Sequence, residues 1–374
     1  MKKKINLVHF SVHRNIIGNA GDKMHIPVLR KAFDQFLNFK IKWHLKEIWE
    51  NTSHQQIKQF NKKQDGIVVG GGGIFLKDQS NSSVKKSGYQ LNLSVNEIKK
   101  IKIPMIFFGI GYNRFRNQED FNDKIVKNVK ECLKKKIFYG LRNSGSIEKL
   151  SKRINVKKNE FDYQPCITTI LDKLDYFKVF SVKNLKKKYI GFGFAADRIK
   201  MRFSSIEKEK LFLKTLTDLI DSTPKNYKII FIYHKNIDNY FYKQLDKKYQ
   251  KKIREININN MSIKSIYKFY HKLDLVFAMR GHHQLISLGT KTNFFSFITH
   301  DKIKFVCKDN GLKNYSSDIN CKNFYSKTIN FYKNYFKKND KIKKIIKKAF
   351  DKNYKITKQN FLLIEKKILE IKKK

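Results

Sequence analysis

Short apolar runs alternate with helical patterns along most of this chain, and this alternation constrains its fold more than any other feature. In the first half the apolar runs lie at 5–10, 41–48, 66–70, 104–111 and 136–142, and helical patterns lie between them at 21–37, 53–63, 94–102, 119–135 and 144–153. A strand that is apolar along its whole length is typical of a parallel sheet, because helices cover both faces of such a sheet. The first half is therefore predicted to form parallel βαβ units.

The same pattern begins again after a lysine-rich break at 182–188. Further apolar runs lie at 189–195, 228–234, 254–259, 273–279 and 293–298, and helical patterns lie at 205–221, 237–250, 261–271 and 282–289. After residue 335, apolar residues recur at helical spacing in a lysine-rich tail, which is expected to pack on the body. We therefore predict an α/β protein with two Rossmann-like domains facing across a cleft, at 1–175 and 187–334, and a C-terminal helical tail at 335–374.

The chain carries a formal net charge of +49, from 81 Lys and Arg against 32 Asp and Glu. Such a charge attracts nucleic acids and anionic membranes. However, all but ten of the 81 are lysines spread along the chain, and abundant Asn, Ile, Phe and Tyr indicate the coding bias of an AT-rich genome. No zinc-knuckle, RRM or helix-turn-helix signal is present. We therefore predict no nucleic-acid partner. The arginines carry more information than the lysines, because a lysine does not replace the planar guanidinium of arginine.

Cysteine usage and hydropathy indicate a cytoplasmic protein. The four cysteines, at 132, 166, 307 and 321, form no CxxC pair, so they are expected to be reduced thiols. No stretch approaches the roughly 18 apolar residues of a membrane span. Peripheral attachment to the inner face of the membrane stays open as an alternative, and the sequence does not indicate an oligomeric state.

Glycines and polar residues gather where the predicted strands end, which is where ligands bind in open α/β sheets. Asn19 and Asp22 lie in a turn before the first helix, where they would shape an anion site at its N-terminus or simply cap it. Gly70 to Gly73 follow a buried strand and would allow a ligand or the other domain to approach the backbone closely. We predict that Gly71, Gly72 and Gly73 belong to a substrate-binding loop.

Arginine and histidine follow two other predicted strands. Arg142 stands at a strand tip before a helix, where its fork would hold a carboxylate or phosphate or make a salt bridge at the rim. Arg280, His282 and His283 follow the run at 273–279. An arginine beside a group that titrates near neutral pH favours an anion site with an acid or base next to it. Arg280 and His282 are the predicted catalytic residues, and Arg142 and His283 are predicted to bind substrate.

One segment matches the glycine pattern of a dinucleotide-binding motif but lacks the helix that must accompany it. The segment GFGFAA at 191–196 fits G-x-G-x-x-A, but the residues after it form a basic loop, whereas the fingerprint requires a helix to begin inside the motif. No H-E-x-x-H or DxD cluster is present either. We predict no nicotinamide or flavin cofactor and no essential metal.

Taken in order, these elements resemble the polysaccharide pyruvyltransferase family. The corresponding residues here are Asn19 with Gly21 and Asp22, the glycine run, Gly109-Ile110-Gly111, Arg142 with Ser146, Arg280-Gly281-His282, and His300-Asp301-Lys302. Asn143, Gly281 and His283 depart from the residue types usual in the family, which puts the substrate in doubt rather than the fold.

The resemblance implies a fold similar to type B glycosyltransferases and a reaction in which a pyruvyl group moves from phosphoenolpyruvate to two hydroxyls of a sugar or glycan, forming a cyclic ketal. The donor carries a carboxylate and a phosphate, which suits Arg142 and Arg280 as clamps. The resemblance further implies that His282 transfers protons, that Lys302 balances the phosphate and that Ser146 belongs to the substrate site.

A type B glycosyltransferase that uses a nucleotide sugar is the main alternative. Such an enzyme usually holds the donor's ribose with an acidic residue, and an E-x-x-x-x-x-x-E pattern is not evident in the sequence. Release of inorganic phosphate from phosphoenolpyruvate would distinguish the two activities.

Overall fold

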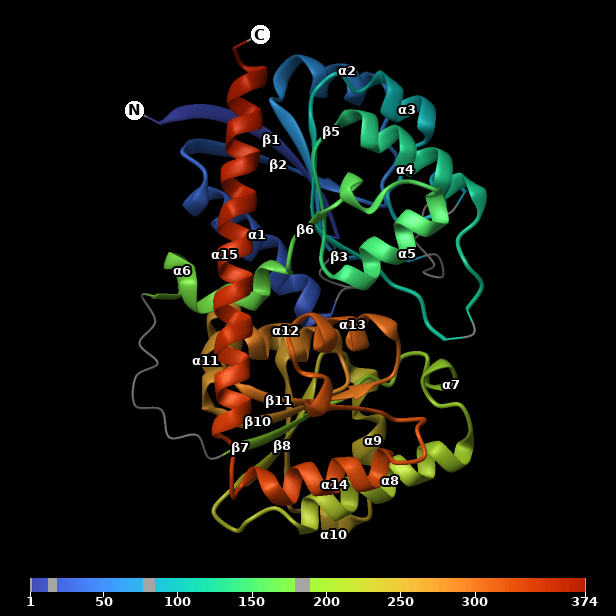
Figure 1. The fold of residues 1–374 in the computed structure, drawn as a ribbon, viewed down its shortest axis with the longest axis vertical. Helices are drawn as coiled ribbons and strands as arrows, with labels where there is room; N and C mark the ends of the chain where they lie inside the picture. Colours follow the sequence, from blue (N-terminus) through green and yellow to red (C-terminus); the bar gives the residue numbers. More distant parts are fainter. Residues whose placement is uncertain (1, 13–18, 77–84, 117, 179–188, 374) are drawn as a thin grey trace.

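The computed structural model describes residues 2–12, 19–76, 85–116, 118–178 and 189–373. Two parallel six-stranded sheets lie one above the other along the molecule (Figure 1). The first sheet has the order β2-β1-β3-β4-β5-β6. Its strands are β1 Lys3–Ser11, β2 Phe39–Glu47, β3 Gly66–Phe75, β4 Met105–Tyr112, β5 Lys136–Leu141 and β6 Asp162–Tyr163, and its helices are α1 Ala20–Phe36, α2 His54–Lys63, α3 Val95–Lys100, α4 Asp123–Lys135 and α5 Ser144–Ile154.

The second sheet has the order β12-β11-β10-β7-β8-β9. Its strands are β7 Tyr189–Gly193, β8 Lys228–Tyr233, β9 Ile253–Asn257, β10 Leu273–Ala278, β11 Asn293–Ile298 and β12 Ser316–Asp318. Its helices are α7 Ile199–Arg202, α8 Ile206–Asp221, α9 Tyr240–Lys243, α10 Lys247–Gln250, α11 Ile263–Lys272, α12 Gly281–Gly289, α13 Asp301–Asp309 and α14 Phe324–Tyr335. The two predicted Rossmann-like sheets are confirmed. The single helix predicted at 237–250 is wrong, because this stretch forms three short helical turns.

The glycine run was expected to leave the sheet as a loop, but β3 continues through it to Phe75. Gly71 and Gly72 have φ angles of +69° and +90°, which side chains rarely adopt. The pairing of β3 with β4 changes register between Gly72 and Phe75. The run is therefore an irregular strand end, in which the positive φ angles redirect the backbone.

The C-terminal tail is one long helix, α15, which spans Asp340–Ile371. It runs beside both sheets and returns to the first domain, so that both chain ends lie at the same end of the molecule (Figure 1). Phe361 is fully buried, and its ring lies 5.0 Å from those of Phe33 and Phe108 in the first domain. Near the end of α15, Lys372 pairs with Asp65 at 2.8 Å. The tail is thus part of the apolar core, and the lysine-rich break predicted at 182–188 falls outside the described residues.

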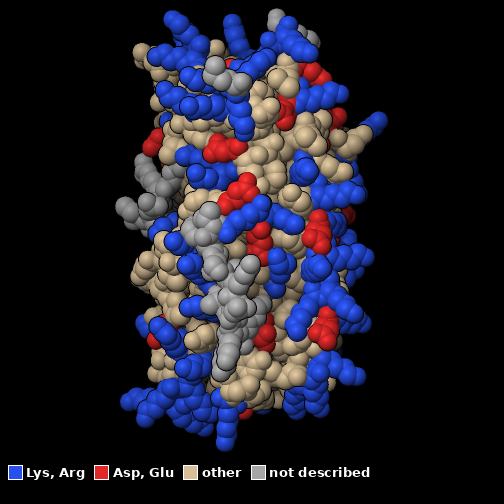
Figure 2. All heavy atoms as spheres, turned by 90° about the vertical axis from the view of Figure 1, so that its left-hand side faces the viewer, with Lys and Arg blue, Asp and Glu red and all other residues tan. Residues whose placement is uncertain are grey.

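Lysine and arginine side chains are scattered over the visible face rather than gathered in one stripe (Figure 2). Within the described ranges, no helix combines the length and the apolar character needed to cross a lipid bilayer. The spread of charge is what a genome-wide coding bias would produce.

Candidate functional site

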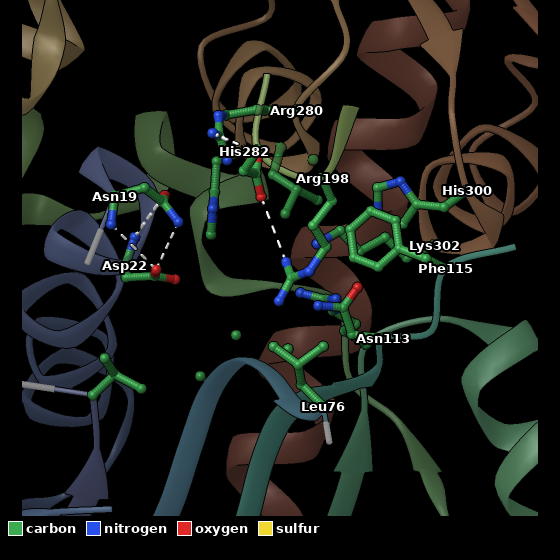
Figure 3. A pocket seen from close by; sticks show the side chains of 18 of the residues that line it. Asn19, Asp22, Leu76, Asn113, Phe115, Arg198, Arg280, His282, His300 and Lys302 are labelled. Carbon is green, nitrogen blue, oxygen red and sulfur yellow. Dashed lines mark hydrogen bonds and ion pairs between the residues drawn. The ribbon is translucent and has the colours of Figure 1, made fainter. Parts of the chain in front are cut away.

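A cavity of about 110 Å³ lies between the two domains, at the ends of their strands. It brings together nine of the predicted site residues, namely Asn19, Asp22, Gly71, Gly72, Gly73, Arg142, Arg280, His282 and Lys302. Figure 3 shows Arg280, His282, His300 and Lys302 entering from the second domain, while Asn19, Asp22, Leu76, Asn113 and Phe115 come from the first. Arg142, from the first domain, and Arg280, from the second, thus line the same cavity.

The N-terminus of α1 forms one wall of the cavity, and the structure shows Asn19 and Asp22 capping this helix. Asn19 is the N-cap: its side-chain oxygen accepts from the Gly21 amide at 2.9 Å and the Asp22 amide at 3.4 Å. Its amide nitrogen donates to Asp22 Oδ2 at 2.6 Å. This capping box satisfies N–H groups of the first turn and fixes Asp22 beside the cavity.

Arg142 follows β5 and crosses the end of β4, where Gly111 leaves it room. A Cβ at Gly111 would lie 2.7 Å from Arg142 Nη2 and closer still to Nε. Only 6% of Arg142 is exposed, Nη2 has no hydrogen-bond partner, and burial lowers its pKa. Among the described residues no carboxylate pairs with it, so the salt-bridge interpretation is not supported. A buried donor that faces a cavity without a partner is suited to an anionic ligand.

Ser146 does not line the cavity. It is fully buried in the first turn of α5, and its hydroxyl accepts from the Tyr112 amide at 3.0 Å. Asn143 caps the same helix by accepting from the Ser146 amide at 2.7 Å. Ser146 therefore ties the end of β4 to α5, and the prediction that it binds substrate is not supported.

Arg280 lines the cavity, but its guanidinium is already paired with carboxylates of the protein. Nε donates to Asp238 Oδ2 at 2.8 Å and Nη2 to Asp238 Oδ1 at 2.6 Å, while Nη2 also lies 2.8 Å from Asp197 Oδ1. Burial lowers the pKa of Arg280, yet the two carboxylates outweigh it and raise the pKa above its usual value. The expected two-pronged clamp on substrate is therefore not supported, because that edge of the guanidinium is held by Asp238.

His282 projects from the start of α12 into the cavity, between Asp22 on one side and Arg198 on the other (Figure 3). Gly21 leaves room for its ring, because a Cβ there would overlap the imidazole. Its Nε2 is buried and has no hydrogen-bond partner. The ring therefore lines the cavity with one nitrogen that has no hydrogen-bond partner in the protein.

His283 points away from the cavity, so the structure does not support the prediction that it binds substrate. It is fully buried, its Nδ1 lies 2.6 Å from the Tyr270 hydroxyl, and its ring lies 4.2 Å from that of His234. Burial and the nearby charge of Arg280 lower its pKa. Consecutive helical residues lie on different faces, so only one of the two histidines can enter the cavity.

A known protein family matches most of this chain. The family model described as polysaccharide pyruvyl transferase matches residues 18–302, which include all the cavity residues named above. The chain belongs to this family. A search of curated proteins gives no match.

This pyruvyl transferase family member also shares its fold with solved structures. A putative UDP-N-acetylglucosamine 2-epimerase from Listeria monocytogenes superposes with a TM-score of 0.55, at 10% identity over 92% of this chain and 91% of that one. S. aureus MnaA with UDP gives 0.52, at 10% identity over the same shares. The Neisseria meningitidis UDP-GlcNAc 2-epimerase bound to UDP-GlcNAc gives 0.50, at 10% identity over 92% and 94%. These structures have the two-domain arrangement of type B glycosyltransferases.

Sequence reasoning missed an aromatic contact at the edge of the family site. Phe115, from the first domain, stacks on His300 with ring centroids 4.6 Å apart. The guanidinium carbons of Arg198 and Arg202 lie 4.9 and 5.2 Å from its centroid. Next to it, Arg116 forms a two-pronged pair with Asp318 of the second domain. The arginine-rich segments around 114 and 198 were visible in the sequence, but their meeting across the cleft was not.

A second missed cluster lies behind His282. His25 is buried with no hydrogen-bond partner on either ring nitrogen, and its ring lies 6.5 Å from that of His282. Cys166 is buried beside both rings. Burial raises the pKa of this thiol, but the two imidazoles outweigh that effect and lower the pKa well below its usual value. No local sequence signal joins these three residues, because they come from three separate segments.

Proposed function

We propose that this protein transfers the pyruvyl group of phosphoenolpyruvate to two hydroxyls of a sugar in a surface polysaccharide or its precursor, forming a cyclic ketal. The observation that carries the proposal is a positively charged interdomain cavity with a histidine inside it. Six basic side chains line it, against the carboxylates of Asp22 and Asp197: Arg142, Arg198, Arg202, Lys235, Arg280 and Lys302. A donor with a carboxylate and a phosphate complements this charge.

The reaction requires several proton transfers. The methylene carbon of the donor gains a proton, both sugar hydroxyls lose theirs, and the phosphate leaves with one. His282 is placed to carry protons between the hydroxyls and the methylene carbon, because its Nε2 is unpartnered in the cavity. Arg142 holds the phosphate or the carboxylate with its unpartnered Nη2. We expect the reaction to need no essential metal or further cofactor.

Use of a nucleotide sugar as donor is the second candidate, because S. aureus MnaA, a structure of the same fold, contains UDP. Pockets for drug-sized ligands typically enclose about 300–1,000 Å³, whereas this cavity encloses about 110 Å³. The smaller volume favours a compact donor such as phosphoenolpyruvate.

We also propose that the enzyme is cytoplasmic and that it contacts the inner membrane surface if the acceptor is lipid-linked.

The test is to incubate the purified protein with phosphoenolpyruvate and a panel of sugars and lipid-linked or nucleotide-linked sugars. We expect acceptor-dependent release of inorganic phosphate, together with an acceptor product that contains a pyruvate ketal by mass spectrometry and NMR. The same panel with UDP-sugars is the comparison. Release of UDP, with no phosphate from phosphoenolpyruvate under any condition, would show that the second candidate is correct.

A further inference from the structure

Lys302 is a cavity amine without an acidic partner among the described residues. It lies in the first turn of α13 and lines the cavity, and its chain passes Gly281, where a Cβ would lie 3.4 Å from Lys302 Cε. The neighbouring carboxylate of Asp301 is paired with Lys149 instead. No hydrogen bond or ion pair of the Lys302 amine is present in the described structure.

The charges around this amine are mainly positive. The charged and titratable groups that share the cavity with it are Asp22, Arg142, Asp197, Arg198, Arg202, Lys235, Arg280, His282 and His300. Asp197 is already paired with Arg202 at 2.9 Å and with Arg280 at 2.8 Å, so little of its charge is left for Lys302. Asp22 is engaged by the side chain of Asn19 at 2.6 Å. The amine therefore faces Arg142 and Arg202 without a carboxylate of its own.

Burial, and then the charges of Arg142 and Arg202, lower the pKa of Lys302 to about 7. Near neutral pH a large share of the empty protein thus holds this lysine as a neutral amine. A dianion that enters the cavity should raise the pKa of Lys302, because it supplies the negative charge that the surroundings of the amine lack. The amine lines the same cavity as Arg142, whose Nη2 has no partner, so an anion bound in this cavity would also favour protonation of Lys302.

We propose that the Lys302 amine takes up a proton when the donor's phosphate enters the cavity, and that it is the acid that protonates the departing phosphate. This step rests on the proposed pyruvyl transfer. As the bond between C2 and the bridging oxygen breaks, that oxygen takes the electron pair and the proton of the ammonium, so that hydrogen phosphate leaves and the amine becomes neutral. One hydroxyl proton reaches the methylene carbon through His282, and the other passes to solvent, which restores the proton taken up on binding. No oxidant or reductant is required.

The linkage is testable without donor or acceptor, using sulfate, which stays dianionic from pH 6 to 9. Calorimetry at pH 8 in two buffers of different ionisation enthalpy gives the protons taken up per sulfate bound. With a pKa of about 7, roughly nine-tenths of the amines are neutral at pH 8. We expect uptake approaching one proton and an affinity that falls about tenfold per pH unit above 7. Lys304, exposed on the same helix, supplies the control: Lys304→Met should leave both values unchanged.

Three outcomes decide the inference. The Lys302→Met variant should bind sulfate more weakly, and binding should take up no proton. The Lys302→Arg variant should bind sulfate at all pH values tested, again without proton uptake. Lys302→Arg should also lose at least tenfold in kcat while its KM for phosphoenolpyruvate stays close to that of the unmodified protein. Uptake that persists in Lys302→Met would assign the proton to His282 or His300 and overturn the inference. Failure of pyruvyl transfer alone leaves the sulfate result standing, so the two proposals fail separately.

Discussion

Substitution of Gly111 by Ala tests whether Arg142 holds the donor. The added Cβ would lie 2.7 Å from Arg142 Nη2 and nearer to Nε, closer than real contacts allow. Gly111 does not have a positive φ angle, so its backbone accepts alanine. The atoms in conflict form the mobile end of a side chain, and the cheapest response is for the guanidinium to leave the cavity. The fold should therefore survive while the binding site loses a cation.

The expected loss follows from the interaction that disappears. A hydrogen bond to a charged group contributes about 1.5–3 kcal/mol, which corresponds to roughly ten- to 150-fold in affinity. Calorimetric titration with phosphoenolpyruvate measures this loss, and thermal unfolding checks the fold. Gly66→Ala is the matched control, because its Cβ would lie 3.3 Å from the Pro104 carbonyl, outside the cavity lining. Unchanged donor affinity in Gly111→Ala, with the fold intact, would refute the role given to Arg142.

Three further predictions concern the second domain. Arg280→Lys should lower the free energy of unfolding by about 1–3 kcal/mol in urea titrations, because Asp238 loses its two-pronged partner; a donor affinity that falls further than in Arg142→Lys would contradict this view. His282→Asn should bind donor normally and reduce phosphate release at least 100-fold; normal turnover would exclude it as the proton carrier. Burial first, then neighbouring positive charge, lowers the pKa values of His234 and His283. Below the unfolded-state pKa of about 6.5 the unfolded chain takes up protons that the folded protein does not, so the free energy of unfolding falls as the pH falls. The urea midpoint should therefore drop between pH 7 and 5. It should drop less in the His283→Gln variant, which lacks one of these histidines.

The sheets could be predicted from the sequence because buried parallel strands need continuous apolar runs, and these runs are local. The break of the predicted helix at 237–250 was not visible, because its side chains suit both a helix and successive short turns. The very short strands β6 and β12 escaped detection since two or three residues carry no periodicity. Strand existence thus follows from composition over a few residues, whereas helix continuity depends on tertiary contacts.

The site was predicted in its location and only partly in its contacts. Arg280 lies 42 residues from Asp238 in the sequence, and no local sequence pattern predicts that this carboxylate binds its guanidinium. His282 and His283 are equivalent in composition, and only the rotation of α12 decides which one meets the ligand. Glycines proved the most informative residues once the structure was known, because Gly21 and Gly111 each leave space for one side chain of the cavity.

The path of α15 decides how the two halves can separate. The chain returns from the second domain to the first within α15 itself, which lies along both sheets (Figure 1). Because this helix is continuous across both domains and Phe361 anchors it in the core of the first, we expect the domains to move relative to one another by rotation about a line near α15. The Phe115 contact with Arg198, Arg202 and His300 would then separate first. Substrates would enter, and products would leave, along the rim that Phe115 closes.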